Sequence, residues 1–137
     1  MPIDIDHLGI AVRSIDKALE FYQQQLGFSV SARETVAHEK VHVAMLPAGG
    51  PRIELLEPSE EDSVIGRFLA KRGEGLHHIA FRVPDLAASV ATLKQNGARL
   101  LGEPQRGAGG HLYVFVHPSS TGGVLIELIQ QEQEQHI

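Results

Sequence analysis

IDHLGIAV at residues 5–12 and LHHIAFRV at residues 76–83 are two versions of one short stretch, and they decide how this chain folds. Each is an apolar run with a histidine near its start and a valine at its end. Alternation along a β-strand places every second side chain on one face. The large apolar side chains therefore share one face, which we expect to pack against another element, while the histidine faces look into a less crowded space. The histidine faces carry His7, Gly9 and Ala11 in the first stretch, and His78, Ala80 and Arg82 in the second.

Composition places the chain among ordinary globular proteins. Its 137 residues fit one compact domain, or two small half-units that share a core. No apolar run approaches the roughly 20 residues of a membrane helix, and the N-terminal residues do not resemble a secretory signal. With no cysteine in the sequence, disulfides and thiolate ligands are excluded, and we expect a cytoplasmic protein. The net charge of −5 and the scattered positions of the 12 Lys and Arg residues argue against binding to nucleic acid or membranes.

The first half of the chain reads as a β-α-β-β-β unit, a module of about residues 4–58. Ser14 is a good N-cap, the apolar spacing that follows is helical, and Gly27 can end the helix. Alternating or apolar runs then predict three further strands, with a loop at residues 34–40 and a Pro/Gly turn at residues 47–51. These strands are expected at residues 28–33, 41–46 and 52–56.

An acidic linker and a short helix, about residues 62–73, lead into a second module of about residues 75–130. Its first strand is expected at residues 77–83, and Asp85 caps a helix that ends near Asn96. The remaining strands are expected at residues 98–101, 112–117 and 123–129, with a Gly-rich loop at residues 103–110. The tail, residues 131–137, has no core pattern and is expected to fray.

Position-by-position mapping supports a duplication. His7 maps on His78 at an offset of 71, and the offset rises to 73 for the last strand because one turn is longer in the second copy. Chance would not keep these residues in order, so we predict an α+β fold of two paired βαβββ modules that form a curved, cup-like sheet. The other mapped pairs are Val12 with Val83, Val43 with Val114, Pro47 with Pro118, and residues 53–55 with residues 126–128.

Each module contributes one histidine on its first strand and one glutamate on its last. If these four residues meet, two imidazoles and two carboxylates suit a divalent ion such as Co, Ni, Zn, Mn or Fe. In an octahedral site two positions would remain for waters or a chelating substrate. The candidate metal ligands are His7, Glu54, His78 and Glu127.

These histidines and glutamates can also have structural or surface roles that involve no metal. A lone histidine at a strand start is often a surface or hydrogen-bonded residue, and the glutamate of an Ile-Glu-Leu run often faces solvent. The recurrence of both types at equivalent positions favours the metal site. The histidines without a mapped partner are interpreted as structural or surface residues: His38, His77, His111, His117 and His136.

These residues resemble the vicinal oxygen chelate superfamily, which includes glyoxalase I, methylmalonyl-CoA epimerases, extradiol dioxygenases and antibiotic-resistance proteins. The resemblance covers nearly the whole chain. Three longer runs are similar to methylmalonyl-CoA epimerases in particular: RIELLEP at residues 52–58, KRGEGLHHIA at residues 71–80, and His117-Pro118 followed by GGVLIEL at residues 122–128.

The resemblance implies a homodimer, a divalent metal with Co²⁺ favoured, and interconversion of (R)- and (S)-methylmalonyl-CoA. The metal would stabilise the enolate that forms when the α proton leaves. Epimerisation also needs acid-base groups on two faces. The family's pattern implies Glu127 for one; its other position aligns with His42, which can equally be a wall residue of the cup. The resemblance also places the loop of residues 107–110 near the mouth of the cup.

Three other functions share this fold. A glyoxalase I type lyase uses the same four ligands on a glutathione hemithioacetal, but its matches outside the ligands are weaker. A non-enzymatic binding protein that sequesters a drug would not need all four ligands. An extradiol dioxygenase is expected to use two histidines and one glutamate, in a longer chain.

Overall fold

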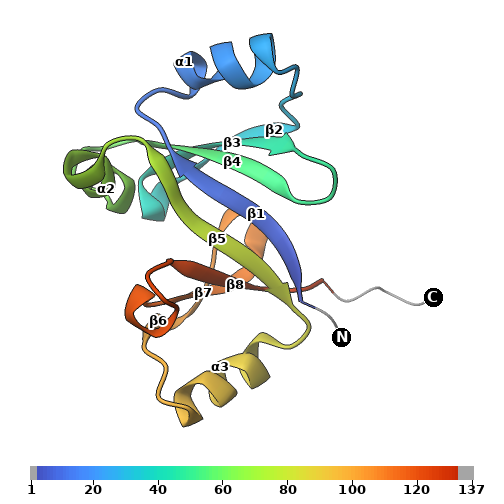
Figure 1. Ribbon diagram of the computed structural model, residues 1–137, viewed down its shortest axis with the longest axis vertical. Coiled ribbons are helices and arrows are strands. Elements are labelled where there is room, and N and C mark those ends of the chain that lie inside the picture. The colour runs from blue at the N-terminus through green and yellow to red at the C-terminus, as the bar shows by residue number, and fades with distance from the viewer. Residues whose placement is uncertain (1–2, 133–137) are drawn as a thin grey trace. The chain divides into compact units, whose positions relative to one another are not determined.

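The computed structural model describes residues 3–132 (Figure 1). The chain forms two compact units. One runs from His7 to His78, and the other combines the residues up to Asp6 with those from Ile79 onward. The sequence-based expectation that the tail frays falls largely on residues 133–137, which lie outside the described residues, as does His136.

The unit from His7 to His78 contains the first βαβββ module and a connecting helix. Its strands follow the order β2-β3-β4-β1, in which β1 and β4 are parallel and the other neighbours antiparallel. The first and last strands of the module are thus direct neighbours. The elements are β1 (Asp4–Ala11), α1 (Ile15–Leu19), the π-helix η1 (Glu20–Gln25), β2 (Ala32–Val36), the 3₁₀ turn η2 (Ala37–Glu39), β3 (Val41–Pro47), β4 (Arg52–Pro58) and α2 (Val64–Arg72).

The other unit repeats the same order of elements. Its strands run β5-β8-β7-β6, with β5 and β8 parallel and the other neighbours antiparallel. Two βαβββ modules are therefore present, as the repeat predicts. The elements are β5 (Gly75–Val83), α3 (Leu86–Gln95), β6 (Leu100–Arg106), the 3₁₀ turn η3 (Ala108–Gly110), β7 (Leu112–Val116), the 3₁₀ turn η4 (Pro118–Ser120) and β8 (Ile126–Gln130).

The three α-helices begin where their capping residues predict. The side chain of Ser14 accepts a hydrogen bond from the Lys17 amide, that of Ser63 from the Gly66 amide, and that of Asp85 from the Ala88 amide. Each cap satisfies a backbone donor that the first helical turn leaves unpaired. The caps therefore fix the residue at which each helix begins.

Each unit buries one apolar face of its strands against its own helix. In the first unit, Ile15 and Leu19 of α1 pack on a cluster that includes Leu55. In the second, Leu86 and Val90 of α3 take the equivalent places. The histidine faces of β1 and β5 point the other way, as alternation predicts. The remaining buried residues of the two clusters are Val12, Ala44 and Leu46 in the first, and Val83, Val114, Val116 and Leu128 in the second.

Several strand boundaries differ from the sequence-based expectation. The strand expected at residues 28–33 lies at Ala32–Val36, because Phe28 and Val30 pack against the helix-side core without joining a ladder. The strand expected at residues 98–101 lies at Leu100–Arg106 and takes in part of the expected Gly-rich loop, with a register shift between Leu101 and Gln105. The last strand begins at Ile126 instead of Gly123.

The third strands of the two modules are offset by 70 residues, not 71. Ala44 pairs with Leu55 in the first module, and Val114 pairs with Leu128 in the second. Val114 is thus the counterpart of Ala44, and the predicted pairing of Val43 with Val114 is wrong. The sequence alignment slipped by one residue here because Val43 directly precedes Ala44, the correct counterpart, and one residue reverses the face of a strand.

Within residues 3–132, no helix is long and apolar enough to cross a membrane.

Candidate metal centre

Three of the four predicted ligands belong to the unit from His7 to His78, and β-strand geometry brings two of them to the same face. β1 and β4 are parallel, with Gly9 opposite Glu54. His7 lies two residues before Gly9 and therefore projects to the side on which Glu54 lies. His7, Glu54 and His78 are all buried, with exposed fractions of 4, 5 and 5%. Buried groups of this polarity require partners.

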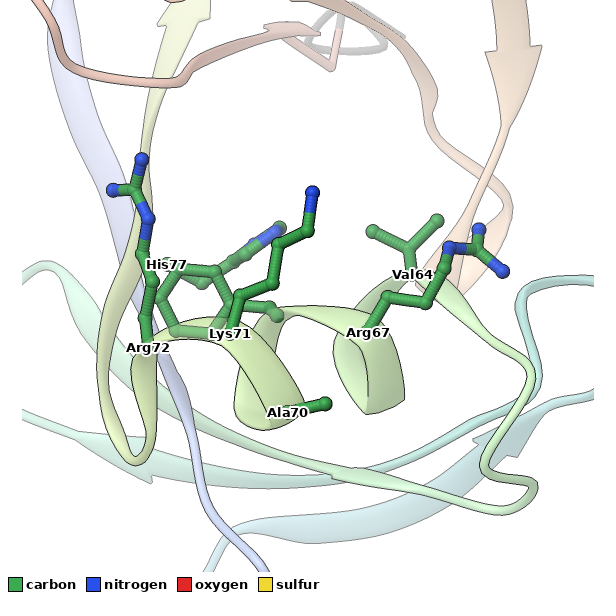
Figure 2. A pocket seen from close by; sticks show the side chains of 7 residues that line it. Val64, Arg67, Ala70, Lys71, Arg72 and His77 are labelled. Carbon is green, nitrogen blue, oxygen red and sulfur yellow. The ribbon is translucent and has the colours of Figure 1, made fainter.

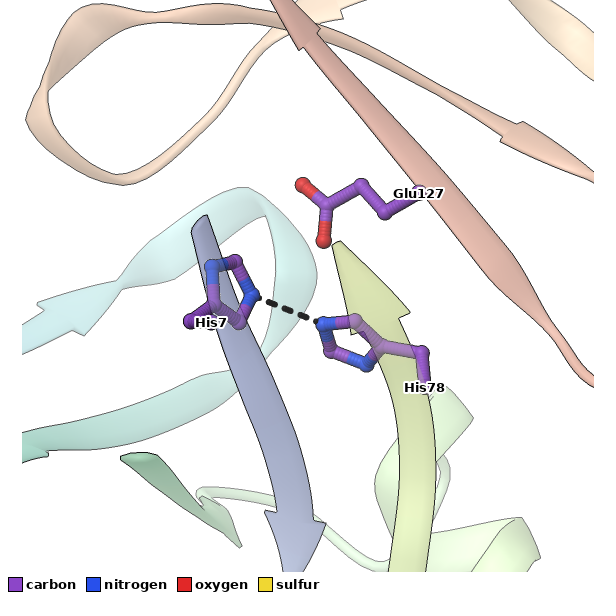
Figure 3. A group of neighbouring side chains, drawn as sticks. All are labelled: His7, His78 and Glu127. Atoms are coloured by element: carbon purple, nitrogen blue, oxygen red, sulfur yellow. Dashed lines mark hydrogen bonds between the residues drawn. The ribbon is translucent and has the colours of Figure 1, made fainter. Parts of the chain in front are cut away.

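The imidazole rings of His7 and His78 face each other through their Nε2 atoms, which lie 3.0 Å apart (Figure 3). Their planes are nearly perpendicular, at 86°. Two imidazole nitrogens that bind one ion at about 2.1 Å and at right angles are themselves about 3.0 Å apart. The Nε2 atoms form a hydrogen bond in this structure, and their separation is also that of adjacent ligands on a single metal ion.

Glu54 lies against both a histidine and an arginine. Its Oε2 atom is 3.2 Å from Nδ1 of His7 and accepts a hydrogen bond of 2.8 Å from Nη2 of Arg52. Carboxylate contact with the second ring nitrogen of a histidine orients the ring and fixes its tautomer. Arg52 supplies a positive charge that partly balances the Glu54 carboxylate.

Gly9 allows the ring of His78 to lie directly on β1. A Cβ atom at residue 9 would come within 2.2 Å of Cε1 of His78 and 2.6 Å of its Nδ1. Any side chain at this position would therefore displace the imidazole. The glycine is a part of the site that the sequence did not single out, and its counterpart in the second module, Ala80, gave no indication of this role.

The Gly9→Ala variant is expected to bind a divalent metal about 10- to 100-fold more weakly than the unaltered chain, because the His78 ring must move. Isothermal titration with the apo protein measures this change. Gly66→Ala is the matched control: its Cβ would lie 2.2 Å from the carbonyl oxygen of Glu61, so it creates a comparable clash in a segment that carries no candidate ligand. Equal metal affinity in the Gly9→Ala and unaltered proteins would contradict the role given to this glycine.

The fourth predicted ligand, Glu127, lies on β8 of the other unit. It is buried, with an exposed fraction of 9%, and its position on β8 is opposite Ala80 of β5. The first module shows the same register, with Glu54 opposite Gly9. Glu54 and Glu127 thus have equivalent positions within their modules, as the repeat predicts.

His42 does not share a face with Glu54, so its expected place among the site residues is wrong. On β3, Met45 is opposite Glu54, and alternation gives Val43 and Met45 the ligand side. His42 lies on the other side with Ala44, which belongs to the core beneath α1. The Nδ1 atom of His42 is 2.8 Å from Oγ1 of Thr35, an exposed contact.

Glu34 is the titratable residue that β2 adds to the ligand side. It is opposite Val43 in the β2–β3 ladder and therefore points to the same side as Met45 and Glu54. The side chain is partly exposed, yet its Oε1 atom is buried and has no hydrogen-bond partner among the described residues. A buried carboxylate oxygen without a partner is costly, and such atoms occur at functional sites.

The other described histidines have local roles. His77 projects away from the ligand side and packs edge-on against the Phe68 ring, although its Nδ1 atom lies 2.9 Å from Nδ1 of His78. His117 accepts a hydrogen bond from the Ser119 amide in its own turn. His38 and His111 are at the surface, near Glu39 and Glu132.

Comparison with known proteins places this architecture in a family. A family model described as the Glyoxalase/Bleomycin resistance protein/Dioxygenase superfamily matches residues 6–115. The chain belongs to this superfamily. The predicted vicinal oxygen chelate fold is therefore confirmed.

Several of the similar proteins are named as epimerases. The chain is 39% identical over 128 residues to the mitochondrial methylmalonyl-CoA epimerase of Homo sapiens, covering 92% of this chain and 73% of the relative. It is 39% identical over 129 residues to the ethylmalonyl-CoA/methylmalonyl-CoA epimerase of Cereibacter sphaeroides, covering 92% and 96%. A solved methylmalonyl-CoA epimerase in complex with methylmalonyl-CoA and ammonium has a TM-score of 0.89 at 42% identity, with 96% of each chain covered.

Proposed function

We propose that this protein is an isomerase that interconverts (R)- and (S)-methylmalonyl-CoA with the help of a divalent metal ion. The observation that carries the proposal is the buried cluster of His7, His78 and Glu54, in a chain that is 39% identical to proteins named as epimerases. We further propose a single domain of two modules that acts as a homodimer.

In this proposal His7, Glu54, His78 and Glu127 hold the ion. The Nε2 separation of the two histidines supports the assignment, and Glu127 joins them as the module counterpart of Glu54. Imidazole with carboxylate suits Co²⁺, Ni²⁺, Zn²⁺, Mn²⁺ or Fe²⁺, and we favour Co²⁺. When bound, the ion supplies positive charge for the thioester and carboxylate oxygens on which negative charge develops.

Two carboxylates carry the protons. The carboxylate of Glu127 accepts the α proton from one face of the substrate, and protonated Glu34 donates a proton to the opposite face, which inverts the α carbon. In the reverse direction the two residues exchange roles, and solvent returns each to its starting state. Glu34 fits because it points to the ligand side two strand spacings, about 10 Å, from the strand of Glu54. Val43 and Met45 lie on β3, the strand between those of Glu34 and Glu54, and make this part of the sheet surface apolar.

The second candidate function is a glyoxalase I type lyase, which would use the same ligands. The 39% identity to epimerases, against 32% to a probable lactoylglutathione lyase of Vibrio cholerae, favours the thioester substrate.

A substrate comparison separates the two functions. The metal-loaded protein is expected to epimerise methylmalonyl-CoA, to lose this activity after treatment with a chelator, and to recover it with added Co²⁺. It is expected to leave the hemithioacetal of methylglyoxal and glutathione unchanged. Initial rates with both substrates at matched concentrations give the answer, and turnover of the hemithioacetal alone would assign the protein to the lyases.

A further inference from the structure

Helix α2 carries a cavity of about 390 Å³ whose wall is strongly basic (Figure 2). Three of its seven lining residues are cationic, and none is acidic. This is a local concentration, because the whole chain has a net charge of −5 and only 12 Lys and Arg residues. The lining consists of Val64, Arg67, Phe68, Ala70, Lys71, Arg72 and His77.

The three cations lie close together along the last turns of α2. Arg67 and Lys71 are four residues apart and therefore neighbours on the helix surface. Arg72 follows, with its guanidinium carbon 6.0 Å from the centre of the Phe68 ring. Val64, one turn earlier, is 57% exposed although apolar. The cavity thus combines positive charge with exposed apolar surface, as a ligand that carries both phosphates and an organic chain requires.

The charges of this cavity are available to an anion. Arg67 pairs with Asp62 at 2.7 Å, but both side chains are largely exposed, at 60 and 88%. Exposed pairs of this kind contribute little stability. A phosphate can replace the carboxylate and form bidentate bonds with the guanidinium group. Lys71 adds a second positive charge on the same side of the helix.

One residue links the cavity to the candidate metal ligands. His77 lines the cavity, and its Nδ1 atom lies 2.9 Å from Nδ1 of His78. The His77 ring also packs against Phe68, the middle residue of α2, a helix of nine residues that is about 13 Å long. An acyl-CoA carries its thioester at one end and its phosphates at the other, so a substrate whose acyl group reaches His78 can follow this helix with the rest of its length.

We infer that the α2 cavity binds the phosphate groups of the acyl-CoA substrate through Arg67, Lys71 and Arg72. The inference rests on the proposed function, since it assigns the coenzyme part of that substrate to a site. The competing explanation is that Lys71 and Arg72 only stabilise the C-terminal end of α2, where cations interact favourably with the helix dipole.

The test compares methylmalonyl-CoA with methylmalonyl-pantetheine, a thioester that has no phosphate. The variant is Arg67→Gln/Lys71→Gln/Arg72→Gln. Its KM for methylmalonyl-CoA is expected to rise about 10- to 100-fold, because charge-assisted bonds to phosphate are lost. This penalty is expected to disappear with methylmalonyl-pantetheine. Lys94→Gln, which removes the last-turn cation of α3, is the matched control and should leave both KM values as they are.

Three outcomes would overturn the inference: an unchanged KM for methylmalonyl-CoA, an equal rise for both thioesters, or a variant that differs only in its thermal unfolding. If the unaltered protein epimerises neither thioester, the proposed function fails, and the cavity is then judged by calorimetry with coenzyme A itself. Binding by the unaltered protein and loss in the variant would support the cavity assignment, whereas equal affinities or no binding by either protein would reject it.

Discussion

The His78→Ala variant is expected to lose its metal and, with it, at least about 10³-fold in kcat/KM for methylmalonyl-CoA. The buried His78 ring supplies one of the two Nε2 atoms that lie 3.0 Å apart, so its removal leaves His7 without the facing nitrogen. A Lewis-acid metal contributes several kcal/mol to stabilising the developing charge, and each 1.36 kcal/mol corresponds to a factor of ten. Metal content per chain after gel filtration and steady-state kinetics measure the two effects.

The control for this variant is His38→Ala, which removes an exposed histidine. It should keep its full metal content. Because the loss of a buried ring can also destabilise the fold, His78→Gln provides a larger replacement, and circular dichroism reports whether each variant is folded. A folded His78→Ala or His78→Gln protein with unchanged metal stoichiometry would remove His78 from the ligand set.

The Glu34→Gln variant is expected to separate proton exchange from inversion. Without a proton donor on one face, the epimerisation rate should fall about 10²- to 10⁴-fold, the contribution of a general acid-base group. In the proposed mechanism Glu127 removes the α proton of one stereoisomer, so this isomer should continue to exchange its proton with deuterated solvent while its configuration is kept. The other stereoisomer should neither exchange nor invert. Mass spectrometry and chiral analysis of each isomer measure the four quantities.

Metal content should be the same in Glu34→Gln and the unaltered protein, because Glu34 lies two strands from Glu54. Glu20→Gln, which alters an exposed carboxylate on η1, is the control and should epimerise at the normal rate. A Glu34→Gln protein that inverts both isomers at the normal rate would exclude Glu34 from proton transfer.

The repeat in the sequence predicted the parts of the site that occur twice. His7 and His78, and likewise Glu54 and Glu127, are at equivalent positions in two modules with the same ladder register. Duplication makes such residues recognisable in the sequence, because the same residue type recurs at the equivalent position of both copies. The capping residues likewise predicted the helix starts, since a cap and its amide partner are only three residues apart.

Residues whose role depends on strand register were not predictable in this way. Glu34 fell in an expected loop, because the strand was placed four residues too early and the alternation of β2 was hidden. His42 was assigned to the wrong side, where a single-residue slip in β3 is enough to reverse a face. The roles of Gly9 and Arg52 could not be predicted from the sequence, because they depend on neighbours in space. Gly9 lies against the His78 ring, and Arg52 bonds to the Glu54 carboxylate.

The central claim, that this chain inverts methylmalonyl-CoA by removing its α proton, is tested most directly in deuterated water. Metal-loaded protein is incubated with the (S) isomer, and the product is analysed for configuration and for deuterium at the α carbon. The account predicts conversion to a mixture of both isomers, with deuterium in the inverted product. Recovery of the (S) isomer with its configuration intact and no deuterium at the α carbon, from protein with its metal bound, would contradict it.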